Sequence, residues 1–115
     1  MRVRRRFRFE AAHRLPRHEG KCRELHGHSY EVVISVERPV DESSGMVIDF
    51  SDLKQIVRRQ AIDKLDHRCL NDLIDNPTAE NMAEWIWRRL VGELPGLVEV
   101  ELCETRDCSV VHRGA

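Results

Sequence analysis

The stretch RVRRRFRFEAAH, residues 2–13, alternates between charged and apolar side chains. Alternation with a period of two is typical of a β-strand that buries one face and exposes the other. The apolar parity consists of Val3, Phe7, Phe9, Ala11 and His13, and the other parity of Arg2, Arg4, Arg6, Arg8 and Glu10. We therefore expect a half-buried strand over residues 2–13, with His13 on its apolar face.

A second alternating stretch, HGHSYEVVISV at residues 26–36, follows a loop that contains Pro16 and Gly20. Its core parity consists of His26, His28, Tyr30, Val32, Ile34 and Val36. The pattern predicts a second strand that ends before Pro39 and runs antiparallel to the first if the two pair.

Two segments in the middle of the chain have helical periodicity. The first follows Asp49 or Ser51, either of which can cap a helix, and its apolar residues recur at helical spacing up to about Leu65. The second begins after Thr78, a suitable N-cap, and stops before Pro95-Gly96. We expect one helix in each segment.

The end of the chain returns to strand periodicity. Residues 98–103 alternate between apolar and polar side chains, and residues 108–112 can form a further strand after a turn at Arg106-Asp107. The order ββααββ predicts an α+β fold with a four-stranded antiparallel sheet and two helices on one face. Residues 1–115 contain no repeat and no linker, so we expect a single domain.

The composition is that of a soluble globular protein, since 41% of the residues are hydrophobic and 34% are charged. The net charge is −1 with acids and bases interspersed, which argues against a nucleic-acid partner. The N-terminus lacks the apolar core of a signal peptide, and no apolar run could span a bilayer. We therefore expect a cytoplasmic protein with no membrane partner and with four free cysteines.

Three histidines share the apolar faces of the first two strands. His26 and His28 stand two residues apart, which places their Cβ atoms roughly 7 Å apart on one face of a strand, and His13 lies on the apolar parity of the neighbouring strand. A single histidine there would be interpreted as a satisfied core residue. Three that converge predict a zinc site, and three neutral imidazoles leave the fourth position open, as in catalytic zinc sites.

Cys22 lies four residues before His26, between the cations Lys21 and Arg23. Neighbouring cations favour the thiolate, so Cys22 is a candidate fourth zinc ligand or catalytic base. An inert loop thiol explains the same residues equally well.

Two acidic positions are further candidates. Asp66 precedes His67 where the first helix ends, so the carboxylate can orient the imidazole, although a helix cap beside a surface histidine is the simpler explanation. Glu104 continues the apolar parity of the third strand, and a buried carboxylate needs a partner. That partner is either an arginine of the sheet or a ligand with a fork of N–H donors, such as a pterin or guanine.

The arginines of residues 2–8 could form a phosphate track. Glutamates also occupy the polar faces of the other strands, namely Glu31, Glu99 and Glu101. Cross-strand pairing of opposite charges is therefore the simpler interpretation.

Six motifs follow one another along the chain. They are FEAAH (9–13), Cys22-x-x-x-HGHSY (22–30), MVIDF (46–50), LDHRCLN (65–71), PTAEN (77–81) and Glu104-Thr105. In order and spacing they resemble the 6-pyruvoyltetrahydropterin synthase family, which includes the 6-carboxytetrahydropterin synthases, over nearly the whole chain.

This resemblance implies the tunnelling fold, in which subunits join edge to edge into a barrel and active sites lie at subunit interfaces. It implies a homo-oligomer built from trimers, such as a hexamer, and exposed strand edges agree with such assembly. Matching the motifs gives His13, His26 and His28 as zinc ligands, Cys22 as general base or acid, Asp66 and His67 as proton relay, Glu104 as pterin anchor, and Thr78 as a backbone contact.

The implied substrate is 7,8-dihydroneopterin triphosphate. Zinc acts as a Lewis acid on the side-chain hydroxyls, while Cys22 and His67 move protons so that triphosphate is eliminated. In the queuosine branch a carbon–carbon cleavage then releases acetaldehyde and leaves 6-carboxy-5,6,7,8-tetrahydropterin.

The number of residues between Cys22 and His26 indicates which branch of the family the chain resembles. Three residues separate Cys22 from His26, as in the 6-carboxy enzymes, whereas the animal pyruvoyl enzymes carry a longer insertion. A third branch, which makes 6-hydroxymethyl-7,8-dihydropterin, has a glutamate in the equivalent loop, so Glu24 keeps that alternative open. A non-catalytic pterin- or purine-binding protein of the same fold would keep Glu104 and could lose the zinc and relay residues.

Overall fold

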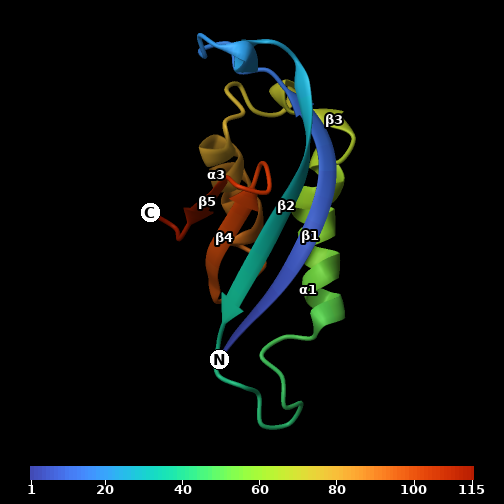
Figure 1. Ribbon diagram of the computed structural model, residues 1–115. Helices are drawn as coiled ribbons and strands as arrows, with labels where there is room; N and C mark the ends of the chain where they lie inside the picture. The colour runs from blue at the N-terminus through green and yellow to red at the C-terminus, as the bar shows by residue number, and fades with distance from the viewer.

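A long β-hairpin runs the length of the molecule, as Figure 1 shows. Strands β1 (Arg2–His13) and β2 (His26–Glu37) pair antiparallel, with a register that runs from Arg2 opposite Glu37 to His13 opposite His26. The computed structural model describes all 115 residues, and the molecule measures 53 × 24 × 24 Å. Both alternating stretches of the sequence are therefore strands, as predicted.

The sheet has five strands in the order β3-β1-β2-β4-β5. Strands β4 (Leu97–Cys103) and β5 (Ser109–His112) continue the antiparallel sheet beyond β2, which confirms the four predicted strands. The fifth strand, β3 (Arg68–Cys69), pairs parallel with β1 at Ala11 and Ala12 and was not predicted. Two residues are too short to show a periodicity, so the sequence pattern could not indicate it.

The first predicted helix is one continuous rod with an irregular middle. It comprises α1 (Phe50–Val57), a π-helical turn η2 (Arg58–Ile62) and α2 (Asp63–Leu65). Asp49 is its N-cap and accepts hydrogen bonds from the backbone N–H groups of Ser51 and Asp52. The second predicted helix is α3 (Ala79–Leu90), capped by Thr78, and two short 3-10 turns complete the chain, η1 (Lys21–Arg23) and η3 (Leu70–Asp72).

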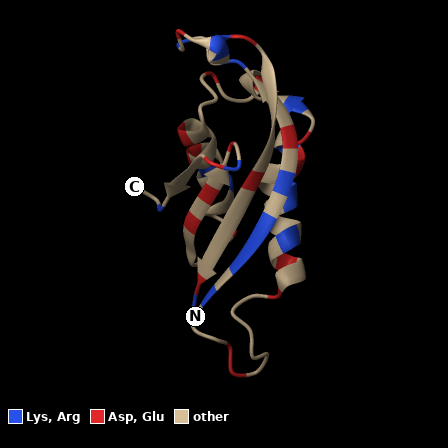
Figure 2. Ribbon diagram, viewed as in Figure 1, with Lys and Arg blue, Asp and Glu red and all other residues tan.

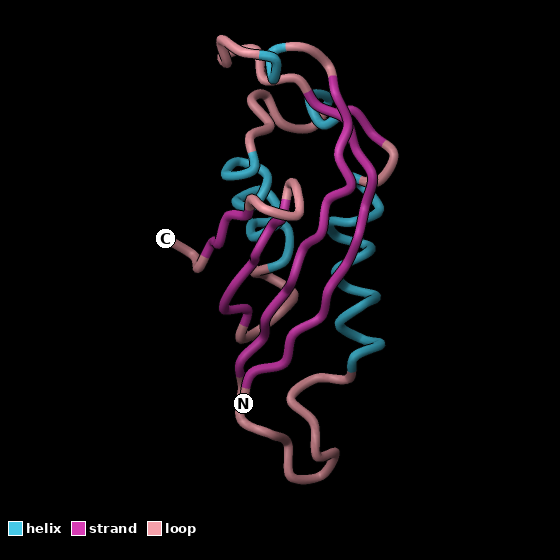
Figure 3. Tube along the Cα trace, in the orientation of Figure 1, coloured by secondary structure: helices cyan, strands magenta, loops and turns pink.

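Both helices cover the same face of the sheet, on the far side in Figures 1 and 3. The apolar parities of the strands and the apolar sides of the helices form one cluster of 22 buried residues, among them Phe9, Tyr30 and Leu102. We call this the inner face of the sheet, and the side that carries the arginines the outer face. None of the helices has the length and apolar character that a membrane span requires.

Candidate functional site

The register of the β1–β2 hairpin brings three imidazoles together at its far end. His13 lies opposite His26 and Ala11 lies opposite His28, so the three histidines occupy neighbouring positions on the inner face. One ligand atom from each ring lies within 4.8 Å of the other two. The ring centroids are 4.6–5.1 Å apart. The structure therefore groups the three predicted metal ligands.

Backbone carbonyls fix the protonation of two of these rings. His13 Nδ1 donates to the carbonyl of buried Pro77 at 2.8 Å, and His26 Nδ1 donates to the carbonyl of Glu24 at 2.7 Å. A carbonyl can only accept, so each ring carries its proton on Nδ1 and presents a lone pair on Nε2. The two Nε2 atoms lie 3.0 Å apart. This outer-shell arrangement is the one that orients histidines toward a metal.

The environment of the cluster fits a divalent cation. Two lone pairs that face each other repel unless a cation lies between them, and His28 Nε2 is buried without a hydrogen-bond partner. Burial lowers the pKa of His13 and of His28, which keeps both rings in the neutral form that binds metal. Nitrogens bound to one tetrahedral zinc at about 2.0–2.1 Å lie about 3.4 Å apart, which is close to the 3.0 Å between His13 Nε2 and His26 Nε2.

Glu104 borders the imidazole cluster. Its Oε1 atom lies 3.3 Å from His13 Nε2 and 3.7 Å from His28 Nε2, and its backbone N–H donates to the carbonyl of Cys108 in the β4–β5 turn. No arginine pairs with this carboxylate, so the sheet-arginine alternative is not what the structure shows. The Glu104 side chain is 26% exposed, so a ligand can reach it.

Thr78 and Tyr30 support the cluster from two sides. The Thr78 hydroxyl accepts the backbone N–H of Asn81 at 3.1 Å and so fixes the start of α3, directly after the Pro77 carbonyl that holds His13. Tyr30 is fully buried, stacks on Phe9, and places its hydroxyl 3.3 Å from His13 Nδ1. Tyr30 was not predicted as a site residue, although it shares the parity of His26 and His28.

Asp66 and His67 form a pair at the other side of the hairpin. Asp66 is extended, and His67 has a left-handed backbone with φ of 58°, the only positive φ outside glycine. Asp66 Oδ1 accepts the backbone N–H of Glu10 at 2.9 Å and lies 3.0 Å from His67 Nδ1. The Glu10 N–H, and then His67, lower the pKa of the Asp66 carboxyl, which keeps it ionised. An ionised carboxylate at this distance orients the imidazole for proton transfer.

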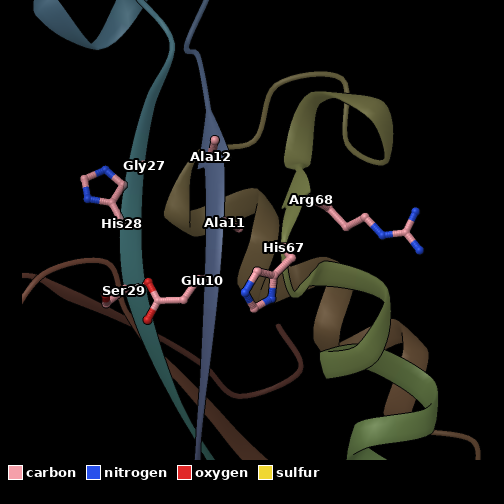
Figure 4. A pocket seen from close by; sticks show the side chains of 8 residues that line it. All are labelled: Glu10, Ala11, Ala12, Gly27, His28, Ser29, His67 and Arg68. Atoms are coloured by element: carbon pink, nitrogen blue, oxygen red, sulfur yellow. Dashed lines mark hydrogen bonds between the residues drawn. The ribbon is translucent and has the colours of Figure 1, made fainter.

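His67 lines a hollow of about 460 Å³ beside the β1–β2 pair. Its lining includes Glu10, Ser29, His67 and Arg68, together with His28 of the imidazole cluster. Strand alternation points Glu10 and Ser29 away from the inner face, and in Figure 4 the rings of His28 and His67 lie on opposite sides of the β1–β2 pair. The His67 ring therefore lies across the hairpin from the His28 ring, although both residues line this hollow.

Cys22 lies in η1, within the loop that joins β1 to β2. Its thiol is free and half-buried, and its carbonyl accepts the backbone N–H of Leu15 at 2.8 Å. The thiol makes no hydrogen bond to His67 and is not among the clustered ligand atoms. The structure therefore brings two groups of predicted site residues together. One group consists of His13, His26, His28 and Glu104, and the other of Asp66 and His67. Cys22 is close to neither group.

Comparisons with known proteins agree on one family. The sequence model of the 6-pyruvoyl tetrahydropterin synthase family matches residues 2–115. A 6-carboxy-5,6,7,8-tetrahydropterin synthase from Synechocystis is 46% identical over 106 residues, which cover 86% of this chain and 82% of that protein. A dihydroneopterin monophosphate aldolase from Pyrococcus furiosus is 42% identical over 93 residues, covering 81% and 77%.

The fold leads to the same family. The structure of Caenorhabditis elegans 6-pyruvoyl tetrahydropterin synthase superposes with a TM-score of 0.91 at 28% identity, covering all of this chain and 96% of that one. The family model matches nearly the full length of the chain, and the Synechocystis relative is 46% identical, so the sequence comparisons and the fold comparison point to the same family. The chain belongs to the 6-pyruvoyl tetrahydropterin synthase family.

Proposed function

We propose that this chain is a zinc-dependent 6-carboxy-5,6,7,8-tetrahydropterin synthase. The reaction converts 7,8-dihydroneopterin triphosphate and water to 6-carboxytetrahydropterin, acetaldehyde and triphosphate. The observation that carries the proposal is the cluster of three imidazoles whose lone pairs converge beside the Glu104 carboxylate. The carboxy branch is supported by the Synechocystis relative and by the three residues between Cys22 and His26.

The surroundings of each site residue support a specific role in the proposed reaction. Zinc held by His13, His26 and His28 would supply Lewis acidity toward the side-chain hydroxyls of the substrate. Glu104 accepts N–H groups from the aminopyrimidinone edge of the pterin, because its carboxylate has no arginine partner. The Cys22 thiol and the His67 imidazole exchange protons with the substrate side chain, and Asp66 holds His67 in position. Thr78 contributes a backbone contact.

The active site is completed by a second copy of the chain. Within one chain the His67 and His28 rings lie on opposite sides of the β1–β2 pair, and the Cys22 thiol joins neither the relay nor the imidazole cluster, which favours a site assembled from two chains. The sheet ends in β5 on one side and in the two-residue β3 on the other, and such edges pair with further strands. We propose a homo-oligomer built from trimers, with active sites at the subunit interfaces.

Three other functions make different products or none. A 6-pyruvoyltetrahydropterin synthase eliminates triphosphate without losing acetaldehyde. An enzyme of the aldolase type, the activity for which the Pyrococcus relative is named, makes 6-hydroxymethyl-7,8-dihydropterin, and the exposed Glu24 is the residue that would favour it. A non-catalytic pterin-binding protein would release nothing.

Product identification separates these functions. The zinc-loaded protein is incubated with 7,8-dihydroneopterin triphosphate, and the pterin and the aldehyde are identified by mass spectrometry. We expect 6-carboxytetrahydropterin with one acetaldehyde per turnover. The pyruvoyl product without acetaldehyde, or the hydroxymethyl product, would reassign the branch, and unchanged substrate would reject the enzyme assignment.

Zinc binding depends on the imidazole cluster. We expect about one zinc per chain in the wild type and loss of zinc together with activity in His28→Ala, because two imidazoles cannot complete the site. His67→Ala is the matched control, since its ring lies on the other side of the hairpin, and it should keep the metal while losing turnover. Metal analysis after dialysis measures both, and full retention in His28→Ala would contradict the ligand set.

Protons compete with zinc for the same nitrogens. Burial lowers the pKa of His13 and His28 below the ordinary 6.5, so the rings stay neutral somewhat below that pH. Zinc affinity should therefore be constant above about 6.5 and fall as the pH drops below the lowered pKa values. Competition with a chelator of known affinity measures this dependence, and an affinity that is unchanged down to about pH 5 would reject imidazole ligation.

The shared site can be tested by mixing two inactive variants. Cys22→Ala keeps zinc and fold but lacks one proton-transfer group, and His67→Ala lacks the other. If each site takes its thiol and its relay from different chains, co-refolded mixtures should regain about a quarter of wild-type turnover, because random pairing completes about one site in four. Mixtures that stay inactive would place both groups of each site on one chain.

Glu104→Gln tests the pterin anchor. The amide keeps the shape but turns one acceptor into a donor that faces the ligand's own N–H groups, so 7,8-dihydroneopterin should bind weaker by about 2 kcal/mol. The melting temperature should hold or rise, since no arginine pairs with the carboxylate and its only close side-chain neighbours are the His13 and His28 rings. Glu101→Gln, whose carboxylate pairs with Arg4 on the outer face, is the control and should leave pterin affinity unchanged. Unchanged affinity with a lower melting temperature in Glu104→Gln would make Glu104 a structural residue.

A further inference from the structure

The arginines of β1 are not paired evenly with the glutamates of the outer face. Arg2 and Arg4 each have a glutamate close by, Glu37 at 3.4 Å and Glu101 at 3.5 Å. In Figure 2 the basic segments of the sheet lie mainly on β1, and acidic segments lie on the neighbouring β2 and β4. Cross-strand pairing, the simpler of the two sequence interpretations, therefore describes this part of the stripe.

The pairing of charges changes toward the C-terminal end of β1, the end that carries His13. Arg6 and Arg8 both pair with Glu31, at 2.8 and 2.9 Å, so one carboxylate serves two guanidinium groups. Arg106, in the β4–β5 turn, makes no ion pair with any residue of the chain and is exposed. Together Arg6, Arg8, Arg106 and Glu31 carry a net charge of +2.

These arginines surround a hollow of about 610 Å³. Its lining consists of Arg6, Arg8, Ser29, Glu31, Cys103, Thr105 and Arg106. Burial raises the pKa of the Cys103 thiol, with help from the nearby Glu101 and Glu31, so the thiol stays neutral and adds no negative charge. The hollow is therefore a basic pocket with hydroxyl groups at its rim, a combination that suits phosphate oxygens.

The basic pocket adjoins the hollow of the proton relay. Ser29 lines both, and its hydroxyl donates to Glu10, which lies beside His67 in the second hollow. A substrate whose side chain reaches His67 can thus extend its far end along the outer face of the same chain to Arg8 and Arg106.

We propose that Arg6, Arg8 and Arg106, with the Thr105 hydroxyl, form the subsite that binds the phosphate groups of the substrate. This rests on the proposed function, in which the substrate carries a triphosphate. The chain that supplies His67 then also holds the leaving group, while the partner copy holds the pterin. Planar guanidinium groups bind phosphate oxygens through two N–H donors each, so several of them can hold a polyphosphate in one orientation.

Inorganic tripolyphosphate is the probe, with titration calorimetry as the measurement. We expect tripolyphosphate to bind the wild type and to bind Arg106→Ala and Arg8→Ala about tenfold more weakly or worse, the scale of a lost charge-assisted hydrogen bond. Arg4→Ala is the matched control, because Arg4 lies on the same face but pairs with Glu101 outside the pocket, and it should bind like the wild type. The affinity should also fall as salt is raised.

The kinetic arm uses the substrate itself. The KM for 7,8-dihydroneopterin triphosphate should rise in Arg106→Ala, while 7,8-dihydroneopterin, which lacks phosphate, should bind both proteins equally. Equal tripolyphosphate affinity in the wild type, Arg106→Ala and Arg8→Ala would overturn the subsite even if the expected product is formed. Arginine-dependent tripolyphosphate binding without any pterin product would leave the phosphate subsite in place and reject the proposed function.

Discussion

The register between β1 and β2 is the constraint on which the rest of the structure depends. The side chains that form the core on the inner face, such as Phe9 and Tyr30, have the same strand parity as His13 and His28. A slip of one residue would turn that parity to the outer face and remove both the core and the imidazole cluster. Hydrophobic burial along the hairpin therefore sets the positions of the imidazoles, and the Pro77 and Glu24 carbonyls then orient the rings of His13 and His26.

The same alternation explains why the functional groups divide between two faces. Glu10 and Ser29 lie next to Ala11 and His28 in the sequence, yet they face the other side of the sheet. Glu10 holds the relay through its backbone, since its N–H binds the Asp66 carboxylate and its carbonyl accepts the N–H of His67. A left-handed backbone at a residue other than glycine costs on the order of 1–2 kcal/mol, and these hydrogen bonds at β1 offset that cost.

Local patterns predicted the parts that depend on local physics. Alternation predicted the four antiparallel strands, and the capping residues Asp49 and Thr78 fixed the helix starts. The π-helical turn at Arg58–Ile62 could not be predicted, because its carbonyl and side-chain contacts come from elsewhere in the chain: Arg89 donates to the Gln60 carbonyl, and Gln60 binds Glu93. Strand β3 and the position of His67 relative to His28 could not be predicted from local patterns either, because both depend on tertiary contacts with β1.

The candidate metal site is a cost to the folded chain until a cation is bound. His13 is fully buried, His28 Nε2 has no hydrogen-bond partner, and the Nε2 lone pairs of His13 and His26 face each other. The rings of His13 and His26 cannot flip to remove this repulsion, because the Nδ1 proton of each ring is bound to a backbone carbonyl, that of Pro77 or of Glu24. A cation that binds only the folded arrangement stabilises it in proportion to the logarithm of its concentration over its dissociation constant. Binding of a cation at the three imidazoles would thus be linked to folding of the far end of the hairpin, where His13 is the one fully buried histidine.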